Sequence, residues 1–120
     1  MYKPYHLVGL ELGISVASVA LRNEPTGVAM GFTGDVAAVA KRDLKVGDML
    51  DGEGGYMVRG QLMPAAESLA VAALPIGLAQ AVKVINPVAA GDRLSWSDVE
   101  MDSDDEAVQV RRQMEAAFSQ

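Results

Sequence analysis

The chain has 120 residues, enough for one domain with a modest core, and 50% of them are hydrophobic, which excludes disorder of the whole chain. With 10 Lys and Arg against 16 Asp and Glu, the net charge is −6, and six of the acids fall within residues 98–106, where there is no base. The neutral remainder offers no phosphate-neutralising surface. We therefore expect neither nucleic acid nor an anionic membrane as the main partner.

The absence of cysteine excludes disulfides, thiol nucleophiles and zinc sites with Cys ligands, and a single histidine excludes a multi-histidine metal centre. We therefore predict no metal site. That histidine, His6, is expected at a helix start or in an interface. Residues 7–21 form an apolar run that ends in small residues, as a secretion signal does, but Glu11 and two glycines interrupt it and no basic cluster precedes it. The run is also shorter than the ~20 apolar residues that span a bilayer, so we expect a cytoplasmic protein with no membrane partner.

The first predicted element is a helix, because apolar residues recur at spacings of three and four: Leu7, Leu10, Ile14, Ala17 and Leu21. A loop at residues 23–27 follows. Residues 28–32 and 36–40 then have the composition of short β-strands, and the three residues between them form a connection of hairpin length.

Further along the chain, residues 50–55 contain three glycines and predict a turn-rich loop before a brief strand at 56–59. An Ala-rich stretch with proline at its front edge predicts a short helix at 64–73. The last strand is predicted at 78–85.

The C-terminal helix is predicted to begin at Ser103, or within one residue of it. Ser103 as N-cap and Glu106 three residues later have the spacing of a capping box, and the acids at 104–106 complement the positive end of the helix dipole. The apolar stripe of this helix is expected to be formed by Ala107, Val110, Met114 and Ala117.

One motif occurs twice, 44 residues apart. Both copies contain an apolar residue, two spacers, Gly-Asp, any residue and Leu, so that Leu44 to Leu50 corresponds to Val88 to Leu94. We expect each glycine to adopt a backbone angle that other residues avoid and each leucine to return to the core. The repeat fits one domain built of two related halves, although Gly-Asp is also a common turn dipeptide.

The two copies, residues 40–50 and a second copy that ends at Val99, share a basic strand end, a gap, Gly-Asp, and a leucine before an acid. This pattern resembles that of SAF domains, which adopt the β-clip fold and occur in sialic acid synthases, sugar-acid dehydratases and pilus or flagellar assembly proteins. The resemblance implies a mainly β fold with flanking helices (α+β). It places an N-terminal helix and linker at 1–26, an SAF-like β-clip domain at 27–101 and a C-terminal helix at 102–120.

Three runs carry a narrower resemblance: His-Leu-Val-Gly-Leu-Glu at 6–11, Leu-Asp-Gly-Glu-Gly-Gly-Tyr at 50–56 and Leu-Pro-Ile-Gly-Leu at 74–78. They resemble the C-terminal region of NAD(P)-dependent oxidoreductases whose N-terminal Rossmann domain is homoserine-dehydrogenase-like, a group that includes enzymes similar to 1-deoxy-D-xylulose 5-phosphate reductoisomerase. The resemblance covers residues 4–115 and implies NAD(P)H as the cofactor of a parent enzyme. Because no Gly-x-Gly-x-x-Gly follows a predicted strand, we expect no cofactor site in this chain, which would be an excised C-terminal piece or a stand-alone relative.

The best candidate site from the sequence is the 51–55 loop, whose glycines would let backbone amides approach a ligand closely. If the flanking strands pair, five charged residues would gather there: Lys41, Arg42, Asp51, Glu53 and Arg59. Such a cluster could bind a small polar or phosphorylated substrate or dock a neighbouring domain. An ordinary glycine-rich turn with solvated charges is the alternative, and no residue is assigned a catalytic role.

Two functions from different classes therefore remain. The chain is either the accessory C-terminal domain of such an oxidoreductase, contributing to substrate-site closure or oligomerisation, or a stand-alone SAF binding module of the antifreeze-like or assembly-chaperone type. A small sugar-acid dehydratase subunit is a third reading. In the first case the partner is the Rossmann or catalytic domain of the parent, or a second copy of the chain. An independent module should cover Leu7, Leu10 and Ile14 with its own core, whereas an accessory domain should leave them exposed or dimerise through them.

Overall fold

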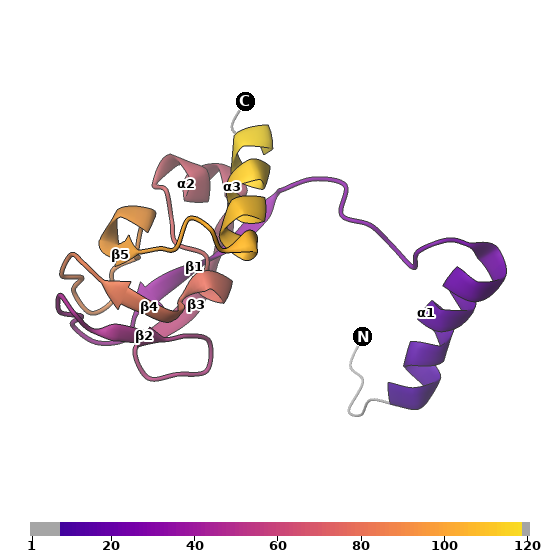
Figure 1. Ribbon diagram of the computed structural model, residues 1–120, viewed down its shortest axis with the longest axis horizontal. Helices are drawn as coiled ribbons and strands as arrows, with labels where there is room; N and C mark the ends of the chain where they lie inside the picture. The colour runs from indigo at the N-terminus through magenta and orange to yellow at the C-terminus, as the bar shows by residue number, and fades with distance from the viewer. Residues whose placement is uncertain (1–7, 119–120) are drawn as a thin grey trace. The chain divides into compact units, whose positions relative to one another are not determined.

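The computed structural model describes residues 8–118 and divides into two units, one that ends at Gly31 and one that begins at Phe32. The first unit contains the helix α1 (Val8–Arg22), and the second contains the strands and the other helices (Figure 1). His6 and Leu7 lie outside the described residues. Within the described chain, no helix combines the length and the apolar character needed to cross a bilayer.

The second unit is built on two small antiparallel sheets. In the first, β1 (Gly34–Ala40) pairs along its whole length with β3 (Val58–Pro64), from Gly34 opposite Pro64 to Ala40 opposite Val58. In the second, β4 (Gln80–Val84) lies between β2 (Met49–Asp51) and β5 (Val99–Glu100). Figure 1 shows β2 and β4 on the far side of the unit from α2 and α3.

The helices of the second unit are short. The helix α2 (Ala65–Ala70) follows β3 directly, and α3 (Glu106–Phe118) closes the chain. Two single 3-10 turns, η1 (Ile76–Leu78) and η2 (Trp96–Asp98), precede β4 and β5. The described chain is thus a small α+β protein with two antiparallel sheets and three α-helices, which is compatible with the predicted class of mainly β with flanking helices.

The repeated motif forms the centre of the second unit. The two copies pair with each other, because Leu44 and Val88 each donate a backbone N–H to the carbonyl of the other, at 2.8 and 3.1 Å. The glycines that follow adopt nearly the same left-handed conformation, with φ of 93° at Gly47 and 91° at Gly91, which a residue with a Cβ rarely adopts. The repeat therefore corresponds to a structural duplication.

The hydrogen bonds of the two turns are reciprocal. Gly47 donates to the Val84 carbonyl at 2.8 Å, and Gly91 donates to the Ala40 carbonyl at 2.9 Å. Val84 and Ala40 in turn donate to the carbonyls of Asp48 and Asp92, at 2.8 and 2.9 Å. Each of these bonds has a counterpart 44 residues away in the other half, so each turn holds the strand that leads into the opposite turn.

The apolar residues around these turns form the core. The leucine that ends each copy returns inward as predicted, since Leu50 and Leu94 are only 2% and 0% exposed. They lie in one cluster with buried residues from the strands and loops, among them Leu44, Val58, Leu74, Val84 and Trp96. Burial of this apolar surface favours folding by about 25 cal/mol per Å².

The hairpin predicted between 28–32 and 36–40 is wrong. Residues 28–33 form no strand, and Val28 and Met30 are exposed. Both edges of β1 are already occupied: β3 pairs along one, and single bridges join Ala37 to Pro75 and Val39 to Arg93 along the other. Because no free edge remains, residues 28–32 cannot join the sheet. The later elements occur with shifted bounds, most clearly β3, which begins two residues later than predicted and continues to Pro64.

The predicted start of the last helix is also wrong. The helix begins at Glu106, and the Asp105 carboxylate caps it by accepting the backbone N–H groups of Ala107 and Val108, at 2.8 and 3.3 Å. Asp105 is therefore the N-cap, and Ser103 lies too far from the first turn to cap it. The Asp102 carboxylate stabilises the preceding turn by accepting the Asp104 N–H at 2.9 Å.

The apolar stripe predicted for this helix is displaced. Of the predicted stripe, Ala107, Val110 and Ala117 are exposed and only Met114 is partly buried. Val108 is buried instead, and the neighbouring Arg111 and Glu115 are partly buried. The inward face of α3 thus combines the apolar Val108 and Met114 with the charged Arg111 and Glu115. The helix adopts this orientation because Arg111 and Glu115 bind side chains of β1 and η2.

Candidate functional site

The loop that the sequence analysis favoured is organised by the Asp51 carboxylate. Its two oxygens accept the backbone N–H groups of Tyr56 and Met57, at 2.5 and 3.0 Å. These hydrogen bonds, with Tyr56 the strongest contributor, outweigh partial burial and hold the pKa of Asp51 below its ordinary value. Both carboxylate oxygens of Asp51 therefore bind backbone groups of the loop itself.

Gly55 and Lys41 complete this arrangement. A Cβ at Gly55 would lie 2.2 Å from the Asp51 carboxyl carbon, so a larger residue would displace the carboxylate. The Lys41 ammonium donates to the Gly55 carbonyl. The structure thus brings Lys41 and Asp51 together, but in a self-contained turn.

The other candidates separate into different places. Arg42 forms an exposed ion pair with Asp48 at 3.4 Å, in the first Gly-Asp turn. Glu53 is exposed at the tip of the loop, where the described residues provide no side-chain partner. Arg59 lies on β3 and lines a pocket elsewhere in the unit. The five predicted residues therefore do not form one site.

The pocket that contains Arg59 has a volume of about 650 Å³, a size typical of small-molecule sites. It lies between β3 and the second Gly-Asp turn. Its lining is mainly polar and comprises Arg59, Gln61, Val71, Gly91, Asp92, Arg93, Leu94 and Ser95.

The strand pairing explains why these side chains converge. Arg59 lies directly opposite Val39 on one side of β1, and Arg93 bridges to Val39 on the other side. Residues directly opposite each other across a ladder point to the same face of a sheet, and so do residues two apart in one strand. Arg59 and Arg93, followed by Gln61 and Ser95, therefore share the face that carries Val39.

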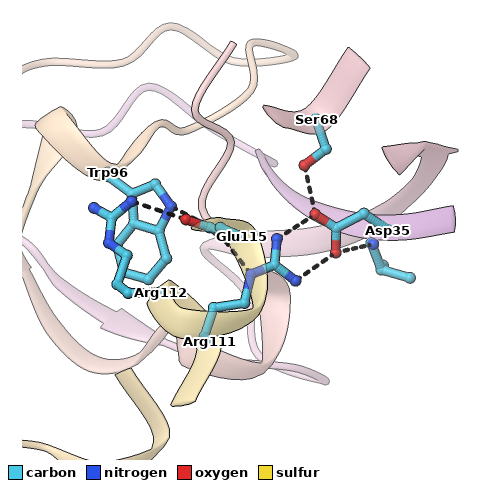
Figure 2. Close-up of polar contacts among 7 residues, drawn as sticks. Asp35, Ser68, Trp96, Arg111, Arg112 and Glu115 are labelled. Carbon is cyan, nitrogen blue, oxygen red and sulfur yellow. Dashed lines mark hydrogen bonds and ion pairs between the residues drawn. The ribbon is translucent and has the colours of Figure 1, made fainter. Parts of the chain in front are cut away.

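A second polar cluster joins α3 to the sheet (Figure 2). Arg111 donates two hydrogen bonds to the Asp35 carboxylate, at 3.0 and 2.6 Å, and Ser68 of α2 donates a third. On its other side the Arg111 guanidinium donates to Glu115 at 2.8 Å. Figure 2 shows the guanidinium between the two carboxylates, so that Arg111 links β1, α2 and α3.

This cluster continues to η2. The Trp96 indole N–H donates to Glu115 at 3.2 Å, and the Arg112 guanidinium lies 3.7 Å from the centre of the Trp96 ring, close enough for a cation–π interaction. Arg112 also pairs with Glu115 at 3.0 Å. We call Asp35, Ser68, Trp96, Arg111, Arg112 and Glu115 the helix clamp.

Burial and pairing act in opposite directions on the clamp. Burial alone would raise the pKa of Asp35, but the hydrogen bonds from Arg111 and Ser68 and the charge of Arg111 outweigh it, so the pKa lies below its ordinary value of 3.8. Asp35 thus stays ionised at neutral pH. Because the Asp35 and Glu115 carboxylates and the Arg111 guanidinium are paired with one another, the clamp stabilises the contact between α3 and β1.

Comparison with known proteins adds no assignment to this geometry: no family model matches the chain, and no match was found among the curated proteins.

The sequence analysis overlooked Arg93, Gln61, Ser95 and the helix clamp. Arg93 lies inside the repeated motif, where it was treated as a spacer. One signal was available: its counterpart 44 residues earlier is Met49, so the two halves differ in charge at this position. The clamp left no local signal, since Asp35 and Arg111 are 76 residues apart.

The Asp51 loop yields a prediction about two of the five candidates. Replacement of Asp51 by Ala should speed hydrogen exchange at the Tyr56 and Met57 amides, because these lose their acceptor, and should lower the melting temperature. Replacement of Glu53 by Ala should change neither. The measurement is amide exchange by NMR on the full chain. Slow exchange of both amides in Asp51→Ala would show that the carboxylate does not organise the loop.

The helix clamp yields a prediction about acid stability. The pKa of Asp35 is lower in the folded protein than in the unfolded chain. The ionised carboxylate therefore adds its full contribution to the free energy of unfolding above the unfolded-state pKa, and this contribution is lost as the pH falls through the folded-state pKa. Asp35→Asn should destabilise the protein by about 3 kcal/mol near neutral pH, the usual cost of breaking a buried ion pair. Denaturant unfolding should show that the difference in unfolding free energy between wild type and Asp35→Asn becomes smaller as the pH falls from about 5 to about 2.

The matched control is Asp104→Asn, which removes one exposed carboxylate on the chain segment before α3. It should change stability by less than about 0.5 kcal/mol, as most exposed substitutions do. A constant difference between wild type and Asp35→Asn across the acidic range would contradict the assigned ion pair.

Proposed function

We propose that this chain is an SAF-type (β-clip) accessory domain of an NAD(P)H-dependent oxidoreductase of the homoserine-dehydrogenase-like or reductoisomerase-like group. In this role it packs on the Rossmann or catalytic domain through α1 and contributes to closure of the substrate site or to oligomerisation. The β-clip assignment is supported by the two SAF-like motifs, which fold into equivalent, mutually paired turns. The oxidoreductase assignment rests on the three sequence runs that resemble the C-terminal region of such enzymes.

The observation that carries the docking role is the composition of α1. Of its 15 residues only Glu11 and Arg22 are charged, and within the first unit the apolar side chains of Ile14 and Leu21 are exposed by 68% and 84%. At about 100° per residue, Ile14 and Leu21 lie roughly opposite Leu12 around the helix axis. Leu12 itself is 60% exposed, so the helix has apolar residues on opposite sides.

A helix that is apolar all round belongs in the core of a larger protein, whereas an independent surface helix has one apolar stripe. Two opposite apolar sides require cover from more than one neighbouring element. A partner domain provides such cover more completely than a single second helix.

The stand-alone binding module remains the second candidate. It is favoured by the polar pocket at Arg59 and Arg93, which lies entirely within the second unit and requires no partner domain to form. The behaviour of α1 distinguishes the two candidates.

The test uses the full chain in isolation. If α1 is a docking helix deprived of its partner, wild type should self-associate in sedimentation experiments and bind a hydrophobic dye. The double variant Ile14→Asp/Leu21→Asp should be monomeric and bind less dye, with unchanged unfolding of the second unit. The same preparation should give no saturable change in NADPH fluorescence, because the proposal places the cofactor in the partner domain.

The control is Val28→Asp, which adds one charge at an exposed apolar position outside α1. It should behave as wild type does. A monomeric wild-type chain with little dye binding would argue against the docking role, and saturable NADPH binding would contradict the accessory role.

A further inference from the structure

We propose that the pocket between β3 and the second Gly-Asp turn binds the oxyanion group of a small polar metabolite, with Arg59 and Arg93 as its two anchors. This inference goes beyond the accessory role. It concerns a binding site within the second unit and holds whether that unit works alone or beside another domain.

The two arginines are placed to reach one ligand. They flank Val39 in one cross-strand row, Arg59 from β3 and Arg93 from the segment on the other edge of β1. Adjacent strands lie about 4.8 Å apart, which separates the two backbones by about 10 Å. Two long side chains that rise from the same face at this spacing can reach one small group between them.

The other half of the duplication carries different charges at the equivalent positions. There the equivalent row is Met49, Lys83 and Glu100, in which Lys83 takes the place of Val39 and Met49 that of Arg93. Its one positive charge is neutralised within the row, because Lys83 and Glu100 form an ion pair at 3.5 Å. The same backbone arrangement thus carries a balanced pair in one half and two cations in the other.

The two guanidinium groups differ from the paired arginines of the second unit. In the described part of the chain, neither Arg59 nor Arg93 has a hydrogen bond or an ion pair, whereas Arg42, Arg111 and Arg112 each pair with a carboxylate. Asp92 lines the same pocket, so the acids and bases at this site leave one excess positive charge. An anion supplied from solution would balance it.

The chemistry of the lining defines the ligand. Arginine presents a planar fork of N–H donors that matches the oxygens of a phosphate or a carboxylate. Gln61 and Ser95 add neutral polar groups, and the Asp92 carboxylate can accept hydrogen bonds from hydroxyl groups. The pocket therefore fits a small hydroxylated molecule that ends in an oxyanion, and a volume of about 650 Å³ accommodates a ligand of this size.

The experiment is an NMR titration of the full chain with inorganic phosphate and, separately, with malonate, each against chloride at the same ionic strength. We expect saturable shifts at the amides of residues 59–61 and 91–95 that chloride does not produce. Tighter binding of phosphate would identify a phosphorylated ligand, and tighter binding of malonate a carboxylated one. Equal, unsaturated responses to all three anions would overturn the proposal.

Variants then test the two anchors. Arg59→Gln and Arg93→Gln should each weaken binding about tenfold or more, the usual effect of losing a charge-assisted hydrogen bond. Arg59→Lys keeps the charge without the fork and should fall between wild type and Arg59→Gln. Arg42→Gln removes an equal charge outside the pocket and should bind as wild type does. If Arg42→Gln lost as much affinity as the pocket variants, the effect would come from the net charge of the protein, and the proposed site would be wrong.

Discussion

The structure depends on the crossed pairing of two Gly-Asp turns. Leu44 and Val88 join the copies at the centre, and each glycine then bonds to the strand that leads into the other turn. Each turn depends on the other half of the chain, because Gly47 bonds to Val84 at the end of β4 and Gly91 bonds to Ala40 at the end of β1. This mutual constraint holds the C-terminal ends of β1 and β4 and brings both motif leucines, Leu50 and Leu94, into one core.

The same framework serves two purposes because the duplicated rows carry different side chains. In the half that contains β4 and β5, the charge of Lys83 is neutralised within its row by the exposed Glu100. In the half that contains β1 and β3, the row through Val39 presents Arg59 and Arg93 to solvent. The helix clamp lies on this same face of β1, since Asp35 is four residues from Val39. Structural and candidate binding groups thus share one strand.

The sequence revealed the features that depend on local chemistry: the helical spacing of α1, the glycine turns and the duplication. The false hairpin at 28–32 shows the limit, because local composition does not reveal that both edges of β1 are occupied by segments far along the chain. The prediction of the inward face of α3 was wrong for a related reason. Asp35 and Trp96, which are distant in the sequence, bind Arg111 and Glu115 and so turn these charged residues inward. Of the five candidate site residues, Arg59 lines the pocket, while the row that joins it to Arg93 exists only in the folded chain.

Native-state hydrogen exchange on the full chain tests the crossed turns most directly. The amides of Gly47 and Val84 report on one turn, and those of Gly91 and Ala40 report on the other. If the turns depend on each other, all four amides should exchange only through global unfolding and should show the same free energy of opening, with the same dependence on denaturant. A lower free energy of opening for one pair than for the other would contradict the account, because it would show that one turn opens while the other stays closed.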